Sequence, residues 1–385
     1  MTPARAEIVV DLAAIRHNVR VLRETTGVEV IVVVKADGYG HGMVEVARAA
    51  RAAGATWLAV TTTDEALALR AAGDSGRLLC WLTVPGEPYA EAVRAGIDLT
   101  AYSVAELDEI AAATDPAAGV TARVQLKVDT GLSRGGAPRA AWAGFFERAR
   151  AGEDAGHWQV TGLWSHLACS DEPDHPANDA QERSFRDALA LADEAGLRPG
   201  LRHLANSAAA ILRPGARFDA VRCGIASDGL DPAPGHTADL GLVPAMTVRA
   251  RLALVKELAA GDGVSYGHTW TAPAPTTVGL VPAGYAEGVP RHASGVASVG
   301  VAGAQRPVRG RVCMDQFLVE LGPGGDGASA GDEVLLFGPG HHGEPTAQDW
   351  AEACDTISYE IVTRIGGRMT RTHVDSDAET GHGAR

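Results

Sequence analysis

The chain has 385 residues, of which 46% are hydrophobic and 21% charged, a composition typical of a soluble globular protein with two or three domains. Its formal net charge of −14 argues against a general nucleic-acid binder, because phosphate backbones attract basic surfaces. The five cysteines are widely spaced, which is typical of a protein from a reducing compartment and does not match the spacing of a metal site. The first residues lack an apolar signal core, and no stretch approaches the roughly 20 apolar residues that span a bilayer. We therefore expect a cytoplasmic protein without a bound metal, a membrane segment or a nucleic-acid partner.

The chain up to residue 223 alternates short apolar runs with amphipathic segments. Eight runs are expected to be strands, at 28–35, 56–60, 77–81, 97–100, 121–128, 158–164, 201–204 and 218–223. Helical patterns between them include 42–53, 63–72, 103–113 and 177–195, and Thr63 to Glu65 and Ser103 offer N-cap side chains. Consecutive apolar residues suit parallel strands buried on both faces. This pattern predicts an α/β fold, a closed (β/α)₈ TIM-like barrel over residues 12–240; an open doubly wound sheet is the competing architecture.

The segments outside the barrel predict a second domain. A strand at 7–10, within an N-terminal segment 1–11, has no place in the barrel, and a helix at 11–24 follows it. Beyond residue 240, strand-like runs are separated by turns rich in Gly and Pro, at 243–258, 276–282, 297–301, 307–312, 317–321 and 333–337. They predict a mostly β domain over 241–371 that ends in short helices at 346–354 and 356–365. The polar residues 372–385 are predicted to form a flexible tail.

Candidate chemistry gathers where the barrel strands end, because barrels place active residues there. Lys35 follows the first run, and burying an ammonium is costly unless it is paired or converted, for example into a Schiff base with an aldehyde cofactor. The alternative is a lysine whose amino group reaches solvent. Loops after the seventh and eighth strands often bind phosphate; here Ser207 offers a hydroxyl, and Gly224 and Ile225 offer N–H groups. Together with two strand-end arginines, these residues point to pyridoxal 5′-phosphate (PLP).

Residues 33–42 resemble the PLP-attachment motif of alanine racemases. Eight further motifs resemble that family in the same order, at 127–134, 164–166, 205–207, 222–225, 264–267, 284–288, 311–316 and 359–360. The resemblance extends from residue 7 to about residue 371. It implies a (β/α)₈ barrel joined to a C-terminal β domain in which the first strand packs, and a head-to-tail homodimer whose partner completes each active site. It also implies a small amino-acid substrate, interconversion of L- and D-alanine, and supply of D-alanine for cell-wall peptidoglycan.

The resemblance assigns roles to individual residues. Lys35 and Tyr266 are implied to be the two catalytic bases, because racemisation needs proton transfer on opposite faces of Cα. The implied cofactor-binding residues are Lys35, Tyr39, His166, Asn206, Ser207, Arg222, Gly224, Ile225 and Tyr359. The implied substrate-side residues are Arg134, Lys127, Met314, Asp315, Tyr285 and Cys313, of which Lys127 matches a position that is often carbamylated. Arg222 at the ring nitrogen keeps its proton, so the electron sink is weak and side reactions are few.

Three departures from the family pattern leave alternatives open. Gly38 replaces an alanine, Asp228 replaces a tyrosine close to the phosphate cradle, and residues 366–371 lack prolines. Such a carboxylate is expected to weaken cofactor binding or alter nearby packing. One alternative is a racemase for serine or another amino acid, and another is a PLP- or inhibitor-binding protein with little turnover. A PLP decarboxylase of basic amino acids is disfavoured by Arg222, because those enzymes typically place an acid at the ring nitrogen.

Overall fold

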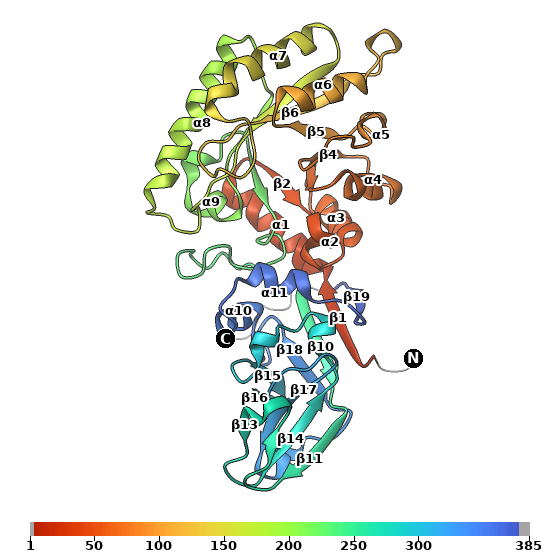
Figure 1. Ribbon diagram of the computed structural model, residues 1–385, viewed down its shortest axis with the longest axis vertical. Helices are drawn as coiled ribbons and strands as arrows, with labels where there is room; N and C mark the ends of the chain where they lie inside the picture. Colours follow the sequence, from red (N-terminus) through yellow and green to blue (C-terminus); the bar gives the residue numbers. More distant parts are fainter. Residues whose placement is uncertain (1–3, 377–385) are drawn as a thin grey trace.

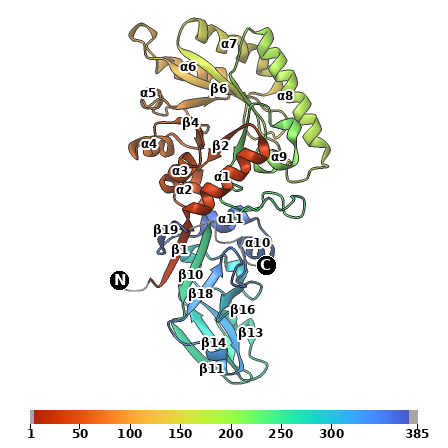
Figure 2. The same ribbon diagram turned by 180° about the vertical axis from the view of Figure 1, so that it is seen from behind.

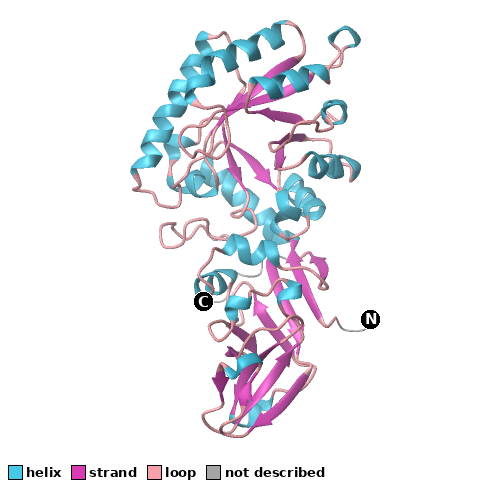
Figure 3. Cartoon of the chain, in the orientation of Figure 1, coloured by secondary structure: helices cyan, strands magenta, loops and turns pink. Residues whose placement is uncertain are grey.

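The computed structural model describes residues 4–376. The chain forms two bodies, a barrel surrounded by helices and an elongated domain built mainly of strands (Figures 1 and 3). Figure 2 shows from behind that helix α1 (Leu12–Thr26) runs along the barrel from the junction between the two bodies. No helix within residues 4–376 is long and apolar enough to cross a bilayer.

The barrel consists of eight parallel strands that close on themselves, since β2 pairs with both β3 and β9. The strands are β2 (Glu29–Val33), β3 (Trp57–Val60), β4 (Arg77–Cys80), β5 (Asp98–Ala101), β6 (Ala122–Lys127), β7 (Trp158–Trp164), β8 (Leu201–His203) and β9 (Ala220–Cys223). All eight predicted runs form barrel strands, so the predicted fold class is confirmed and the open sheet is wrong. Several of the runs are apolar on successive residues because the strands are buried on both faces, as in β3, whose four residues are all buried.

Helices follow the strands and cover the outside of the barrel. They are α2 (Lys35–Tyr39), α3 (Met43–Ala52), α4 (Thr63–Ala71), α5 (Tyr89–Arg94), α6 (Val104–Ala112), α7 (Trp142–Asp154), α8 (Pro176–Glu194) and α9 (Ser207–Leu212). Ser103 caps α6 as predicted, and its side chain accepts from the N–H of Glu106. The cap of α4 is Thr62, one residue before the predicted segment, and forms a reciprocal capping box with Glu65.

The second body is built on a nine-stranded sheet in the order β11-β14-β17-β16-β15-β18-β10-β1-β19. Its strands are β1 (Ala6–Asp11), β10 (Met246–Arg251), β11 (Leu254–Leu258), β14 (Thr276–Val281), β15 (Ser298–Val301), β16 (Ala304–Arg309), β17 (Phe317–Gly322), β18 (Glu333–Phe337) and β19 (Thr370–Val374). The strand from the N-terminus lies between β10 and β19. The predicted run 243–258 is two strands, because the chain leaves β10 at Arg251 and pairs with a different neighbour from Leu254 onward.

The predicted flexible tail 372–385 begins too early. Thr372, His373 and Val374 belong to β19, which pairs in parallel with β1. This strand lies at the sheet edge and its side chains alternate between exposed and half-buried, so no apolar run marks it in the sequence. Residues 377–385 lie outside the described residues. The predicted helices near the end are α10 (Ala347–Ala353) and α11 (Ser358–Arg364), and α11 packs against α2 at the barrel mouth.

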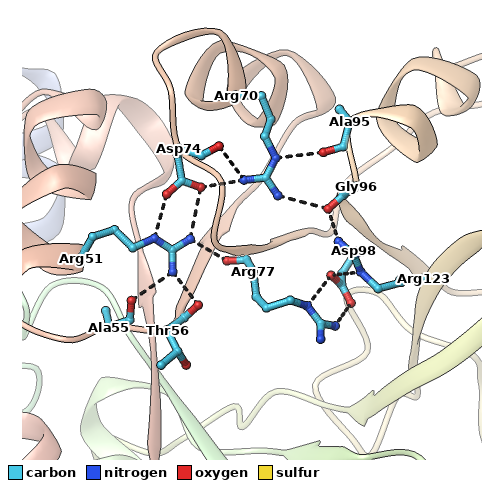
Figure 4. A network of polar contacts seen from close by, with 10 residues as sticks. All are labelled: Arg51, Ala55, Thr56, Arg70, Asp74, Arg77, Ala95, Gly96, Asp98 and Arg123. Atoms are coloured by element: carbon cyan, nitrogen blue, oxygen red, sulfur yellow. Dashed lines mark hydrogen bonds and ion pairs between the residues drawn. The ribbon is translucent and has the colours of Figure 1, made fainter.

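A buried polar network closes the N-terminal end of the barrel, opposite the mouth (Figure 4). The Asp98 side chain is fully buried at the start of β5 and accepts from Arg77 at 2.5 Å, Arg123 at 2.9 Å and Thr161 at 2.8 Å. These partners come from β4, β6 and β7, so one carboxylate links four consecutive strands. Because barrels carry their chemistry at the other end, we assign this network to stability.

Candidate functional site

Lys35 opens a backbone turn of unusual conformation. Strand β2 ends at Val33, two residues before the predicted end, and the turn α2 begins at Lys35. Ala36, Asp37 and Gly38 have φ values of 52°, 54° and 62°, in the left-handed region. Each non-glycine residue there costs about 1–2 kcal/mol, so the surrounding structure must hold the turn. One contact that holds the turn is the hydrogen bond from the Ala36 N–H to a carboxylate oxygen of Glu65, the capping-box residue of α4, at 2.7 Å.

The environment of Lys35 favours a neutral amine. Burial, followed by the nearby charge of Arg134, lowers the pKa of the Lys35 amino group. Its Nζ lies 5.9 Å from the ring centre of Tyr39 and 6.0 Å from that of Trp81. A neutral amine is the form that acts as a nucleophile or a base. This half-enclosed lysine therefore suits both covalent attachment of an aldehyde and proton transfer.

Arg222 lies at the centre of the barrel mouth, with 4% of its surface exposed. It donates to the carbonyl oxygens of Ser165 at 2.8 Å and Leu204 at 3.0 Å, and to the Nδ1 atoms of His166 at 3.1 Å and His203 at 2.9 Å. Burial and the arginine lower the pKa of both histidines well below the usual value, so both rings are neutral acceptors. Burial lowers the pKa of Arg222 to about 9, which still leaves the guanidinium charged at neutral pH.

A second lysine lies close to this arginine. Burial, and then the charges of Arg222 and Arg134, lower the pKa of Lys127 to about 8. Its Nζ is 4.5 Å from the ring centre of Trp164 and 5.0 Å from that of Tyr102. The aromatic faces replace part of the lost hydration of the ammonium. Arg134 itself is exposed, on the glycine-rich loop after β6.

The residues predicted to hold a phosphate lie together at the ends of β8 and β9. The Gly224 N–H donates to Oγ of Ser207 at 3.2 Å, and Asn206 caps the first turn of α9 with its side-chain oxygen. A Cβ at Gly224 would lie 2.2 Å from the hydroxyl of Tyr39, so only glycine permits this close approach. The ring of Tyr359 on α11 is 6.3 Å from that of Tyr39. Hydroxyls and backbone N–H groups thus converge on one small region.

The remaining predicted residues form a separate group on the β domain. They are Tyr266, Tyr285, Cys313, Met314 and Asp315. Tyr266 begins a short turn between β12 (Gly263–Val264) and β13 (Trp270–Thr271) and is 72% exposed, and Met314 is 54% exposed. Across residues 4–376, no hydrogen bond or ion pair joins Tyr266 to the barrel mouth. Within one chain, the predicted site is therefore in two parts.

Two residues at the barrel mouth had no role in the sequence-based prediction. His203 donates from Nε2 to the side-chain oxygen of Gln125 at 2.7 Å while its Nδ1 accepts from Arg222, so it fixes the arginine. Trp164 stacks on His203 with ring centres 5.5 Å apart, and the Arg222 guanidinium lies 4.7 Å above its ring. Both are the last residues of their strands, and that position is the signal that could have identified them.

The donor set of the barrel mouth fits PLP. Lys35 offers an amine for its aldehyde, and Ser207, Gly224 and the buried Ile225 offer a hydroxyl and N–H groups for its phosphate. Arg222 forms no ion pair with a carboxylate anywhere in residues 4–376, so its charge remains available to an acceptor such as a ring nitrogen. These residues supply one partner for each reactive part of the cofactor.

Comparisons with known proteins agree with this geometry. The sequence model of the alanine racemase N-terminal domain matches residues 10–232, and that of the C-terminal domain matches residues 245–373. An alanine racemase of Streptomyces coelicolor is 55% identical over 380 residues, covering 97% of this chain and 96% of the relative. The crystal structure of alanine racemase from D-cycloserine-producing Streptomyces lavendulae has a TM-score of 0.95 and 51% identity, covering 99% of this chain and 100% of that chain.

A more distant structure bears on the cofactor. Alanine racemase from Bartonella henselae, with covalently bound pyridoxal phosphate, has a TM-score of 0.86 and 27% identity, covering 97% of this chain and 100% of that chain. The two domain models, the full-length relatives and the shared fold lead to one assignment: this chain belongs to the alanine racemase family.

Proposed function

We propose that this protein is a PLP-dependent racemase that interconverts L- and D-alanine. The observation that carries the proposal is the buried Arg222, which pairs with no carboxylate within residues 4–376, together with the partly desolvated Lys35, both at the mouth of the barrel. When bound, PLP supplies an aldehyde that condenses with amino groups and a ring that withdraws electrons from the Cα–H bond of an amino acid. The serine and PLP-carrier alternatives have no such observation in their favour.

Arg222 sets the strength of this electron withdrawal. Its N–H groups would donate to the ring nitrogen of bound PLP without giving up a proton, because a guanidinium stays charged near neutral pH. His166 and His203 hold Arg222 in place as neutral acceptors. An arginine in this place would leave the ring nitrogen unprotonated, which would favour return of a proton to Cα over side reactions such as transamination.

Lys35 and Tyr266 provide the two bases. Removal of a proton from one face of Cα and delivery to the other requires groups on opposite sides, and the lowered pKa of Lys35 makes its Nζ a base on one side. Tyr266 of the partner subunit faces the other side. The homodimer is supported by the exposure of Tyr266, Tyr285 and Met314, three large side chains that are uncovered in one chain. Arg134 would then hold the substrate carboxylate. Lys127 would orient that arginine as a carbamate, the modification that the family resemblance implies for this position, because an unmodified ammonium would repel the guanidinium.

The wider role follows from the product. D-Alanine made in the cytoplasm would supply peptidoglycan synthesis, the use that the family resemblance implies. The test is incubation of the purified, PLP-loaded protein with L-alanine in deuterated water. We expect deuterium at Cα and D-alanine to appear together, and faster than with L-serine. Absence of both with the cofactor bound would overturn the proposal, and serine as the better substrate would refute the choice of alanine.

A further inference from the structure

A small closed cavity lies behind the lysine turn, where the barrel meets the β domain. His41 and Asp228 are its polar lining residues, and its apolar lining includes Leu230 of the barrel and Met246 and Phe337 of the β domain. The cavity has a volume of about 10 Å³, counted as the space that the centre of a water molecule can occupy. That is room for a single water molecule. Neither polar residue has a part in the chemistry described above.

His41 presents a buried acceptor to this cavity. The residue is fully buried, and its Nδ1 lies 3.1 Å from the carbonyl oxygen of Gly38 and 3.0 Å from that of Tyr39. Two carbonyl acceptors at Nδ1 place the ring proton there, which leaves Nε2 as a bare acceptor. Nε2 is buried and has no hydrogen-bond partner within residues 4–376. The pKa of His41 is lowered to about 4, mainly by burial and also by the charges of Arg371 and His373 on β19, while the hydrogen bonds to the Tyr39 and Gly38 carbonyls act in the opposite direction. The ring is therefore neutral.

Asp228 presents a buried donor to the same cavity. It is 2% exposed, and its Oδ2 has no hydrogen-bond partner in the described part of the chain. No ion pair joins it to an arginine or lysine within that part, and burial raises its carboxyl pKa well above the usual value. A carboxyl group in such surroundings takes up a proton and becomes an O–H donor. An unsatisfied donor and an unsatisfied acceptor thus border one water-sized space.

We propose that Asp228, as a neutral carboxylic acid, hydrogen-bonds to one buried water molecule in this cavity, and that the water donates to Nε2 of His41. The link satisfies both groups, each of which would otherwise stay buried without a hydrogen-bond partner at a cost in stability. A water with two polar partners is also the minimum that buried hydration sites show. The inference stands independently of the reaction proposed above.

The link reaches the active site through the backbone. His41 donates from Nδ1 to the turn that carries Lys35 and Tyr39, and that turn contains left-handed residues that must be held. The carbonyl oxygen of His41 accepts from Nε2 of His373 at 2.8 Å, which holds the His41 backbone against β19. The backbone N–H of Asp228 donates to the carbonyl oxygen of Ile225 at 3.1 Å, so the residue borders the phosphate region, but no role in the reaction is assigned to its side chain. It is a positioning residue that holds, through the water, the orientation of His41.

The first test uses the unmodified holoenzyme. A high-resolution crystal structure is expected to show one water within hydrogen-bond distance of Oδ2 of Asp228 and Nε2 of His41. Infrared spectra at neutral pH are expected to contain a protonated carboxylic acid band that Asp228→Asn removes. A dry cavity with both atoms unpaired, or an ionised Asp228, would overturn the proposal without any variant having to fold.

The second test separates hydrogen bonding from mere packing. Asp228→Asn keeps a side chain that can donate to the water, whereas Asp228→Leu keeps the branching at Cγ but is larger and has no polar atom. We expect amide hydrogen exchange at residues 38–41 to accelerate several-fold in the Leu variant and to stay near the wild-type rate in the Asn variant. The Nε2 shift of ¹⁵N-labelled His41 should move only in the Leu variant. Equal behaviour of the two variants would refute a positioning role.

Discussion

The buried Asp228 makes a quantitative prediction about stability and pH. Its pKa is raised by burial, so the folded protein holds a proton that the unfolded chain releases above its ordinary pKa of about 3.9. Folding at neutral pH must therefore include proton uptake, which lowers stability as the pH rises. Asp228→Asn removes this requirement while keeping the size and a hydrogen-bond donor. We expect the variant to be more stable than the wild type at neutral pH.

The size of the effect follows from linkage. One proton bound only by the folded state changes the free energy of unfolding by about 1.4 kcal/mol per pH unit, between the unfolded and folded pKa values. The stability gained by Asp228→Asn should thus increase as the pH rises from 5 toward the raised pKa of Asp228, by at most about 1.4 kcal/mol per pH unit. No reduction for solvent screening applies, because the residue is 2% exposed. The gain should shrink as the pH falls toward 4 and the unfolded carboxyl also becomes protonated.

The assay is urea unfolding of both proteins at the same concentration and cofactor loading, from pH 5 to pH 7. Asp174→Asn, at an exposed loop residue, is the matched control and should show no change in slope against the wild type. Calorimetry in buffers of different ionisation enthalpy should give one more proton released per unfolding wild-type chain than per Asp228→Asn chain. Parallel pH profiles for wild type and Asp228→Asn would refute the reasoning, because Asp228 would then be ionised in the folded state.

Three further variants test the site and the barrel. Lys35→Ala should lose covalent attachment of PLP and all measurable racemisation; retained activity would contradict the assignment of Lys35. Tyr266→Phe should keep the cofactor but lose solvent-proton exchange for one enantiomer of alanine far more than for the other, and equal residual exchange rates would argue against two bases. Asp98→Ala should lower the free energy of unfolding by about 2–3 kcal/mol, which urea unfolding measures. The loss is smaller than for a fully buried ion pair because Arg77 and Arg123 are partly exposed. Turnover per folded chain, measured by a racemisation assay, should be unchanged.

The barrel was predictable because its strands have a simple sequence pattern. Strands buried on both faces are rich in successive apolar residues, so eight short runs such as β3 indicated the number and order of strands. Edge strand β19 has no such apolar run, since its polar side chains face solvent on alternate residues. The sequence therefore predicted a flexible tail over most of this strand. The left-handed backbone at Ala36 and Asp37 was also beyond prediction, because neither residue favours that region and only tertiary contacts hold it there.

The residues of the candidate site were largely predictable from the sequence, whereas the hydrogen bonds between them were not. Strand ends and glycine-rich loops indicated Lys35, Arg222 and Gly224, since the chemistry of a barrel collects there. The bond between His203 and Arg222 depends on how two side chains from neighbouring strands meet, which residue spacing alone does not reveal. Similarly, the sequence shows that Asp228 is unusual, but only the fold places it beside the same cavity as His41.

The position of β1 has a consequence for biosynthesis. β1 is synthesised before the barrel strands, yet Ile8 pairs with Val248 on one side and Arg371 on the other. The β domain cannot complete its sheet until β19 has been made, whereas every strand of the barrel precedes β10. The nascent strand must wait unpaired while the barrel forms, a state in which exposed strand edges invite aggregation. Truncation before Thr370 would leave β1 with one bare edge, so β1 and β19 depend on each other for protection.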